Sequence, residues 1–257
     1  MRKLFTVIIL IVAISTPFFA FDVLPVIGDP DSAPNSHVSD HYIEHAVEEC
    51  NSPNMVTAVI VDYRAFDTMF ETTVMFLAGV SVVLLLAGRP KRRLISPSAV
   101  KKRGRTVRGK AVYETVNKDV MISLIEPLIL IYAVYVLFHG EVSLGGGFQA
   151  GALIGMTYLL DVMVGKRQRP IFNLSKFRSA ALAGVGPFIY ALTGLISVFA
   201  GGMYLEYNRL PLPVHQAELH SIGITAVEIG VTIGVAGTII TIINALMERI
   251  SFDDDND

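Results

Sequence analysis

The amino-acid sequence has few of the residues on which most catalytic and redox proteins depend. It has 257 residues, no tryptophan and one cysteine, Cys50, which excludes an internal disulfide and a cysteine-bound iron–sulfur cluster. It contains no CxxC pair, no phosphate-binding glycine loop, no HExxH helix and no nucleophile elbow. We therefore expect neither a catalytic centre nor a bound cofactor in this chain.

Charged residues are also scarce, at 17% of the chain, whereas hydrophobic residues make up 52%. The mean hydropathy of +0.54 is well above that of a soluble domain. A membrane-spanning helix needs about 20 mostly apolar residues, and six runs approach or exceed that length. They are Leu4–Phe21, Thr68–Ala87, Met121–Phe138, Phe148–Val164, Ala180–Phe199 and Ile222–Met247. The sequence thus predicts an all-α integral membrane protein with about six transmembrane helices, of which the last is longer than a bilayer requires.

Lysine and arginine are distributed very unevenly along this pattern. Ten of the 21 basic residues lie in Arg89–Lys110, a stretch that contains no acidic residue. If six helices alternate across the membrane, 19 of the 21 fall on one side, and only Arg64 and Arg209 fall on the other. Because loops rich in lysine and arginine stay in the cytoplasm, we expect a protein of the cell (inner) membrane with both termini cytoplasmic.

The first apolar run allows a second interpretation, as a cleaved secretory signal, because it follows Arg2 and Lys3. Signal cleavage requires small residues at two closely spaced positions, and Phe18 with Ala20 meets this requirement poorly. We therefore interpret this run as a first transmembrane helix that is retained.

The segment between the first two spans, Asp22–Asn54, is acidic and falls on the predicted outer side. Ser39 or Asp40 could cap a short helix within it. The apolar face of this helix would comprise Ile43, Ala46 and Val47. The pattern predicts an extracytoplasmic amphipathic helix that lies against the membrane or a neighbouring subunit.

Two histidines on this helix allow a different interpretation. His41 and His45 are four residues apart, with Glu44, Glu48 and Cys50 nearby, a spacing that could bind zinc. The simpler interpretation is the solvated polar face of an amphipathic helix, and it is favoured because such faces are far more common. We therefore predict no metal site, and metal analysis of the chain distinguishes the two.

Three carboxylates fall inside predicted spans, where an ionisable side chain is costly and marks a functional candidate. Glu71 lies one turn into the second span, Glu126 lies in the third, and Glu228 lies deep in the sixth. Thr225 and Thr232 share a helix face with Glu228, because they are three residues before it and four after it. A carboxylate among hydroxyls can hold a proton or a small cation, but a protonated glutamate can also simply join two helices. Both roles remain open for all three carboxylates.

Two groups of glycines indicate places where helices approach closely. Gly145, Gly146 and Gly147 would begin the fourth span, leaving its first N–H groups exposed and its backbone close to a neighbour. Gly230 and Gly234 in the sixth span are four residues apart, a spacing that allows another helix to pack against them.

The stretch EPLILIYAVYVLFHGEVSLGGGFQAGALIG resembles the signature of the B component (the MnhB domain) of Mrp-type multisubunit sodium/proton antiporters, and that of its relative in archaeal membrane-bound hydrogenases. The shared pattern is a proline-bearing helix, aromatic-His-Gly, and a glycine triplet followed here by Phe148 and Gln149. Leu144 replaces the proline that commonly precedes the triplet. The resemblance covers roughly Tyr113–Met247 and implies an MnhB-like domain of four transmembrane helices over residues 113–257.

The first half contains NMVTAVIVDYRAFDTMFETTVMFLAGV, which resembles MbhE, a small component of membrane-bound hydrogenases. In Mrp antiporters the equivalent part forms the C-terminal end of the largest component. The matching residues are Asn54, Asp62-Tyr63-Arg64, Phe66-Asp67-Thr68 and Glu71-Thr72, with Ala65 in place of the usual glycine. The resemblance implies an MbhE-like part over residues 1–112 with two transmembrane helices, the second beside an ion path. The whole chain resembles an MbhE-like part fused to an MnhB-like domain.

The polar residues of the glycine hairpin are candidates for ion handling. His139 could pair with Glu141 or take part in proton entry from outside, because imidazole titrates near neutral pH. The dipole of the helix that begins at the glycines would attract the Glu141 carboxylate. The alternative for the hairpin is a tight turn packed against another subunit.

Two functions are compatible with the sequence. The first is a non-redox subunit of an Mrp-type sodium/proton antiporter module, contributing to the ion path and to assembly. The second is the same module within a membrane-bound hydrogenase-like respiratory oxidoreductase, and the fused layout favours it. In both, the expected partners are other membrane subunits, the lipid bilayer, Na⁺ and H⁺, with no nucleic acid.

Overall fold

The computed structural model describes residues 2–19, 24, 26–87, 111–164 and 174–254. In chain order the helices are α1 (Arg2–Phe19), η2 (Pro34–Val38), α2 (Ser39–Cys50), α3 (Met55–Thr57), η3 (Ala58–Tyr63), α4 (Ala65–Ala87), α5 (Ala111–His139), α6 (Gly147–Val164), α7 (Lys176–Phe199), η4 (Tyr207–Arg209) and α8 (Gln216–Asp254). All regular structure in these ranges is helical, as predicted. The basic loop Arg89–Lys110 lies outside the described residues.

Residues 1–45 and 46–257 form two compact units, which we describe separately. In the first unit, α1 is an apolar helix of 18 residues, and η2 is a π-helical turn that continues directly into α2. Ser39 has helical backbone angles (φ −65°, ψ −44°). The prediction that Ser39 or Asp40 caps α2 is therefore wrong, because the helical backbone already begins at Pro34 and no free helix end exists there.

Four helices among the described residues are long and apolar enough to cross a membrane: α4, α5, α7 and α8. The other two predicted spans coincide with α1 and α6, which have 18 residues each. At 1.5 Å per residue such a helix is about 27 Å long, slightly less than the roughly 30 Å of a bilayer core. The chain is a multi-pass helical membrane protein, and the number of six spans stays a prediction.

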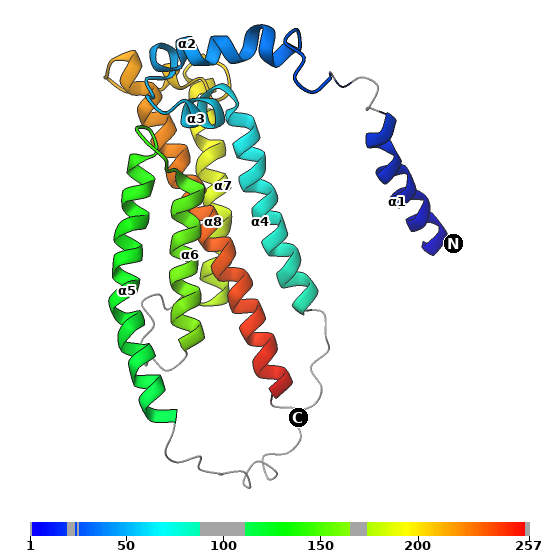
Figure 1. Ribbon diagram of the computed structural model, residues 1–257, viewed down its shortest axis with the longest axis vertical. Helices are drawn as coiled ribbons and strands as arrows, with labels where there is room; N and C mark the ends of the chain where they lie inside the picture. Colours follow the sequence, from blue (N-terminus) through cyan, green and yellow to red (C-terminus); the bar gives the residue numbers. More distant parts are fainter. Residues whose placement is uncertain (1, 20–23, 25, 88–110, 165–173, 255–257) are drawn as a thin grey trace. The chain divides into compact units, whose positions relative to one another are not determined.

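The second unit is organised around α8, drawn from orange to red in Figure 1. Helices α4, α6 and α7 pack directly against α8, and α5 packs mainly on α6. Accordingly, 72% of an apolar 18-residue window of α8 is buried, compared with 11% of such a window of α4. A helix buried on most sides has no polar face to present to water. This explains why the sequence of α8 shows no amphipathic stripe.

Glycines allow the helices around α8 to approach it closely. A Cβ atom at Gly186 of α7 would lie 2.3 Å from the Cα atom of Gly234 and 2.6 Å from the carbonyl oxygen of Gly230. On the α6 side, a Cβ atom at Gly151 would lie 2.8 Å from the carbonyl oxygen of Thr232. These distances are too short for a side chain, so the predicted role of Gly230 and Gly234 as a helix contact is confirmed.

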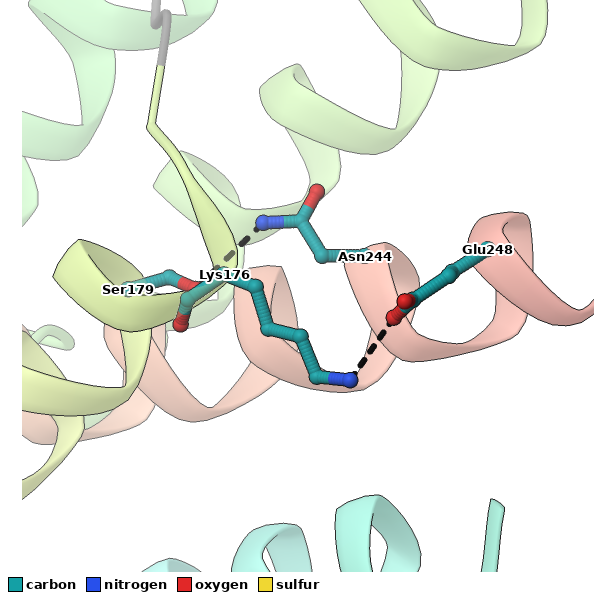
Figure 2. Close-up of polar contacts among 4 residues, drawn as sticks. All are labelled: Lys176, Ser179, Asn244 and Glu248. Atoms are coloured by element: carbon teal, nitrogen blue, oxygen red, sulfur yellow. Dashed lines mark hydrogen bonds and ion pairs between the residues drawn. The ribbon is translucent and has the colours of Figure 1, made fainter. Parts of the chain in front are cut away.

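Polar side chains join the C-terminal half of α8 to the start of α7, as Figure 2 shows. The Lys176 ammonium lies 2.7 Å from a Glu248 carboxylate oxygen, and the Asn244 amide donates to the Ser179 hydroxyl at 3.3 Å. The same amide donates to the Leu174 carbonyl, while the Tyr158 hydroxyl of α6 donates to the Asn244 amide oxygen. Asn244 thereby connects α6, α7 and α8 at one level of the bundle.

Candidate functional site

The candidate site forms where the glycine hairpin meets the N-terminal half of α8. Helix α5 ends at His139 and α6 begins at Gly147, so the prediction that a helix begins at the glycine triplet is confirmed. Gly146 has φ +142°, a backbone conformation that side chains disfavour, and its N–H donates to the Val136 carbonyl at 3.2 Å. A Cβ atom at Gly147 would lie 2.3 Å from the Glu228 carbonyl oxygen. The glycines therefore let the hairpin backbone touch α8.

Glu141 is held by two hydroxyls of α8. Its carboxylate oxygens accept hydrogen bonds from Ser221 at 2.6 Å and from Thr225 at 2.8 Å. These hydrogen bonds direct the Glu141 side chain toward α8. The side chain is half-buried and keeps access to the surface. A carboxylate in this position, with two hydroxyl neighbours, offers several oxygen atoms to a proton or a small cation.

Glu228 lies one helical turn beyond Thr225 and is only 5% exposed. Its Oε1 atom would be 3.2 Å from a Cβ atom built on Gly140 or on Gly146. The carboxylate therefore lies against the hairpin backbone that leads into α6. A side chain at either position would have to displace this carboxylate by a few tenths of an ångström.

The threonines beside Glu228 have different partners from those expected. Thr225 donates to Glu141, and Thr232 donates to the carbonyl oxygens of Glu228 at 2.8 Å and Gly147 at 3.1 Å. The shared helix face is thus observed, but neither hydroxyl is hydrogen-bonded to the Glu228 carboxylate in the part of the chain that the structure describes. Thr232 instead fastens the start of α6 to α8.

The remaining candidates lie apart from this contact. The His139 ring stacks on Tyr135, with centroids 4.7 Å apart, and among the described residues no hydrogen bond joins it to Glu141. Glu126 is fully buried in α5, and Glu71 is exposed on α4. After the glycines, Phe148 packs partly against the core and Gln149 is exposed. Glu141 and Glu228 therefore both lie where the hairpin meets α8, whereas Glu126 and Glu71 lie on α5 and α4.

The pairing of His220 with Asp62 was not predicted from the sequence. His220, the residue before Ser221, lies 2.6 Å from a carboxylate oxygen of Asp62, and both side chains are mostly buried. The Tyr207 ring contacts the His220 ring edge-on. The Tyr207 hydroxyl donates to the Val61 carbonyl at 2.9 Å. Burial raises the pKa of Tyr207, so this phenol stays a proton donor. The only signal in the sequence was Asp62, within the MbhE-like motif.

The histidines of α2 do not complete a metal site in the described part of the chain. His41 and His45 stack with ring centroids 4.6 Å apart, and the His45 Nδ1 atom lies 3.1 Å from the His41 carbonyl oxygen. No group of three or more histidine, cysteine, aspartate or glutamate side chains is placed to hold a metal ion within these residues. On this helix Ala46 and Cys50 are buried, whereas Ile43 and Val47 are exposed.

Comparisons with known proteins assign the part of the chain that contains the glycine hairpin to one family and the N-terminal part to another. Residues 118–241 match a family described as a domain related to the MnhB subunit of Na⁺/H⁺ antiporters, and residues 1–102 match MbhE, the E component of MBH. An uncharacterized protein of Methanocaldococcus jannaschii is 30% identical over 76% of this chain and 73% of its own length. The putative antiporter protein mnhB2 of Staphylococcus haemolyticus is 32% identical over 52% of this chain and 92% of its own length.

Longer proteins and solved structures match as well. A probable K⁺/H⁺ antiporter protein of Rhizobium meliloti, which combines the A and B components, is 26% identical, but this chain spans only 21% of it. The fold resembles a chain of the Mrp complex from Dietzia sp. DQ12-45-1b (TM-score 0.63, 24% identity, 95% of this chain and 26% of that one). It also resembles a chain of an archaeal membrane-bound sulfane sulfur reductase (TM-score 0.58, 26% identity, 96% of this chain and 98% of that one). These matches show that the chain belongs to the MnhB family of antiporter-related membrane proteins, with an MbhE part in front of its MnhB domain.

Proposed function

We propose that the chain is a non-redox membrane subunit of a multisubunit Mrp-type sodium/proton antiporter module, where it forms part of the ion path and contributes to assembly. The observation that carries this proposal is the buried Glu228 in a membrane-crossing helix, packed on the glycine hairpin of the MnhB domain. A carboxylate at such a position is costly and is typical of proton and cation pathways. Membership of the MnhB family supports the same function.

The proposed route enters at Glu141 and continues to Glu228. Glu141 is reachable from the surface, and its hydroxyl neighbours Ser221 and Thr225 provide further oxygen ligands. Glu228 follows one turn deeper in α8, against the glycine hairpin, where its carboxylate could hold either a proton or a small cation. We propose that the rest of the path lies on partner subunits.

The exposed position of Glu71 indicates that such partner subunits are needed. Glu71 is exposed within the membrane-crossing stretch Ala65–Leu86 of α4. An acidic side chain facing lipid costs several kcal/mol. We therefore propose that a partner transmembrane helix covers Glu71. Glu126, fully buried in α5, remains a third candidate for the path.

The proposed arrangement in the membrane follows from the distribution of basic residues. We propose six transmembrane helices in the cell membrane, with both termini in the cytoplasm and α2 on the opposite side. The 19-to-2 distribution of lysine and arginine supports this orientation. We also propose that the chain itself holds no cofactor.

A second function is favoured by one observation on chain layout. The chain matches 98% of a single chain of the sulfane sulfur reductase complex, but only 21% of the Rhizobium antiporter protein. A separate chain that joins an MbhE part to an MnhB domain is therefore compatible with a respiratory membrane complex. In this alternative the same ion-translocating module is driven by electron transfer in other subunits.

Purification of the intact complex through an affinity tag on this chain tests both functions. We expect several other membrane proteins to co-purify, and we expect vesicles with the complex to exchange sodium for protons. Iron–sulfur absorbance and additional water-soluble subunits would assign the complex to the respiratory class. Recovery of the chain by itself, under conditions that preserve known membrane complexes, would contradict both proposals.

A further inference from the structure

We propose that Asn54, in the MbhE part, is a positioning residue for the Glu141 carboxylate in the MnhB domain. This inference rests on the proposed function, in which Glu141 is the entry of the ion path. Asn54 and Gly140 are 86 residues apart in sequence, yet the Asn54 amide donates to the carbonyl oxygens of Gly140 at 2.7 Å and Ser143 at 2.6 Å. These two bonds hold the backbone on both sides of Glu141.

Other groups of the same segment complete the contact. The backbone N–H of Asn54 donates to the Glu141 carbonyl at 3.0 Å, and the Ser52 hydroxyl lies 3.1 Å from that oxygen. The Thr57 hydroxyl donates to the Gly140 carbonyl at 2.7 Å. One short segment of the MbhE part therefore satisfies the carbonyls that follow the end of α5, where helical partners are lacking.

The chemistry of the position requires an amide. The Asn54 side-chain oxygen accepts from the Val56 N–H at 3.1 Å and so caps α3, while its NH₂ group donates to the hairpin. Serine and aspartate can cap a helix but cannot supply the two N–H donors as well. The asparagine side chain has the length to cap α3 with its oxygen and to donate to the hairpin with its NH₂ group at the same time.

Fixing the hairpin backbone fixes both carboxylates of the proposed path. The carbonyls on either side of Glu141 set the direction of its side chain toward Ser221 and Thr225. Gly140 is also one of the two glycines that border the Glu228 carboxylate. Because ion sites depend on ligand positions within about 0.5 Å, loss of the Asn54 donors should disturb ion binding before it disturbs folding.

The test compares Asn54→Ser with Asn35→Ser in the intact complex, reconstituted in vesicles with sodium as the cation. Serine keeps a helix cap at position 54 and adds no charge. Asn35, whose amide donates to the Asp29 carbonyl, undergoes the same chemical change in the first unit. We expect Asn54→Ser to assemble and to raise the apparent KM for sodium by about tenfold, the effect of losing two hydrogen bonds. Asn35→Ser should leave KM unchanged.

Two further variants separate this inference from the proposed function. Glu141→Gln with unchanged transport would reject the ion path itself. Impaired transport in Glu141→Gln together with an unchanged KM in Asn54→Ser would overturn only the positioning role. If Asn54→Ser lowers recovery of the complex, Thr57→Val decides, because it removes both the Thr57 donor to Gly140 and a hydroxyl that accepts from the Asn54 amide. A raised KM in Thr57→Val supports the inference, and an unchanged KM rejects it.

Discussion

Glu228 has two possible roles, and substitution by glutamine separates them. Glutamine keeps the shape and much of the hydrogen bonding but cannot exchange a proton. If Glu228 serves the ion path, Glu228→Gln should assemble normally and lower sodium-dependent proton transport by about tenfold or more. The measurement is transport by vesicles that contain equal amounts of assembled complex.

The control for this prediction is Glu228→Ala. If Glu228 only joins α8 to the hairpin, we expect nearly normal transport in Glu228→Gln and poor assembly in Glu228→Ala. Wild-type transport in Glu228→Gln would therefore reject the ion path through this residue, whatever the alanine variant does.

Cys50 offers a second test at the scale of one residue. It is only 2% exposed, and burial together with the Asp62 carboxylate raises the pKa of its thiol to about 12. Because the thiolate is the reactive form, iodoacetamide at about pH 8 should modify Cys50 roughly a thousandfold more slowly than an exposed cysteine. A suitable comparison is Ser36→Cys in a Cys50→Ala background, since Ser36 is exposed.

The same pKa has a consequence for stability. A thiol with a raised pKa in the folded state contributes stability below its ordinary pKa near 9, and this contribution falls as the pH rises toward about 12. Rapid alkylation of Cys50 in the folded protein at about pH 8 would contradict the buried position.

At the scale of helices, two glycines of α7 make a matched pair. A Cβ atom at Gly186 would lie 2.3 Å from Gly234, whereas one at Gly184 would lie 3.6 Å from the Phe76 ring, an ordinary contact. Alanine favours a helix over glycine by about 1 kcal/mol, so Gly184→Ala should be neutral or stabilising. Gly186→Ala should destabilise the chain by about 1–3 kcal/mol through overpacking.

Thermal unfolding of the two variants in the same detergent measures the difference. Equal melting temperatures for Gly184→Ala and Gly186→Ala would show that α7 and α8 are too far apart for the Gly186 contact to matter.

Helix α8 is longer than a membrane crossing requires. Its 39 residues amount to about 58 Å, nearly twice a bilayer core. His220 and Ser221 near one end of the helix and Glu248 near the other each have a partner from another element. The prediction of a last helix longer than the bilayer is confirmed.

At the scale of the whole molecule, the orientation in the membrane can be tested by labelling. Single cysteines placed between Arg89 and Lys110 in a Cys50→Ala background should react with an impermeant maleimide only after the cells are opened. We expect the ten basic residues of this segment to keep it in the cytoplasm. Cysteines between Asp22 and Asn54 should react from outside, and the reverse pattern would overturn the orientation.

The chain by itself should not transport ions. Glu71 is exposed on a membrane-crossing helix, and the proposed path leaves this chain beyond Glu228, so other subunits must complete it. Reconstituted alone, the chain should give no sodium-dependent pH change above that of empty vesicles, with the full complex as the positive control. Activity comparable to that of the complex would contradict this prediction.

The sequence by itself determined the helical class, the apolar runs and the family. The length of an apolar run is a local property of the sequence. The approximate positions of α4, α5, α7 and α8 could therefore be predicted from the apolar runs alone. The glycine triplet likewise predicted where α6 begins, because such a turn requires residues without side chains.

Only the tertiary structure decided which polar groups meet. Thr225 donates to Glu141, 84 residues away, instead of to its helical neighbour Glu228, and His220 pairs with Asp62 across 158 residues. Periodicity places residues on a face of a helix, but it says nothing of what packs against that face. Partner choice depends on how closely the hairpin approaches α8, and that distance is set by glycine contacts between elements far apart in the chain.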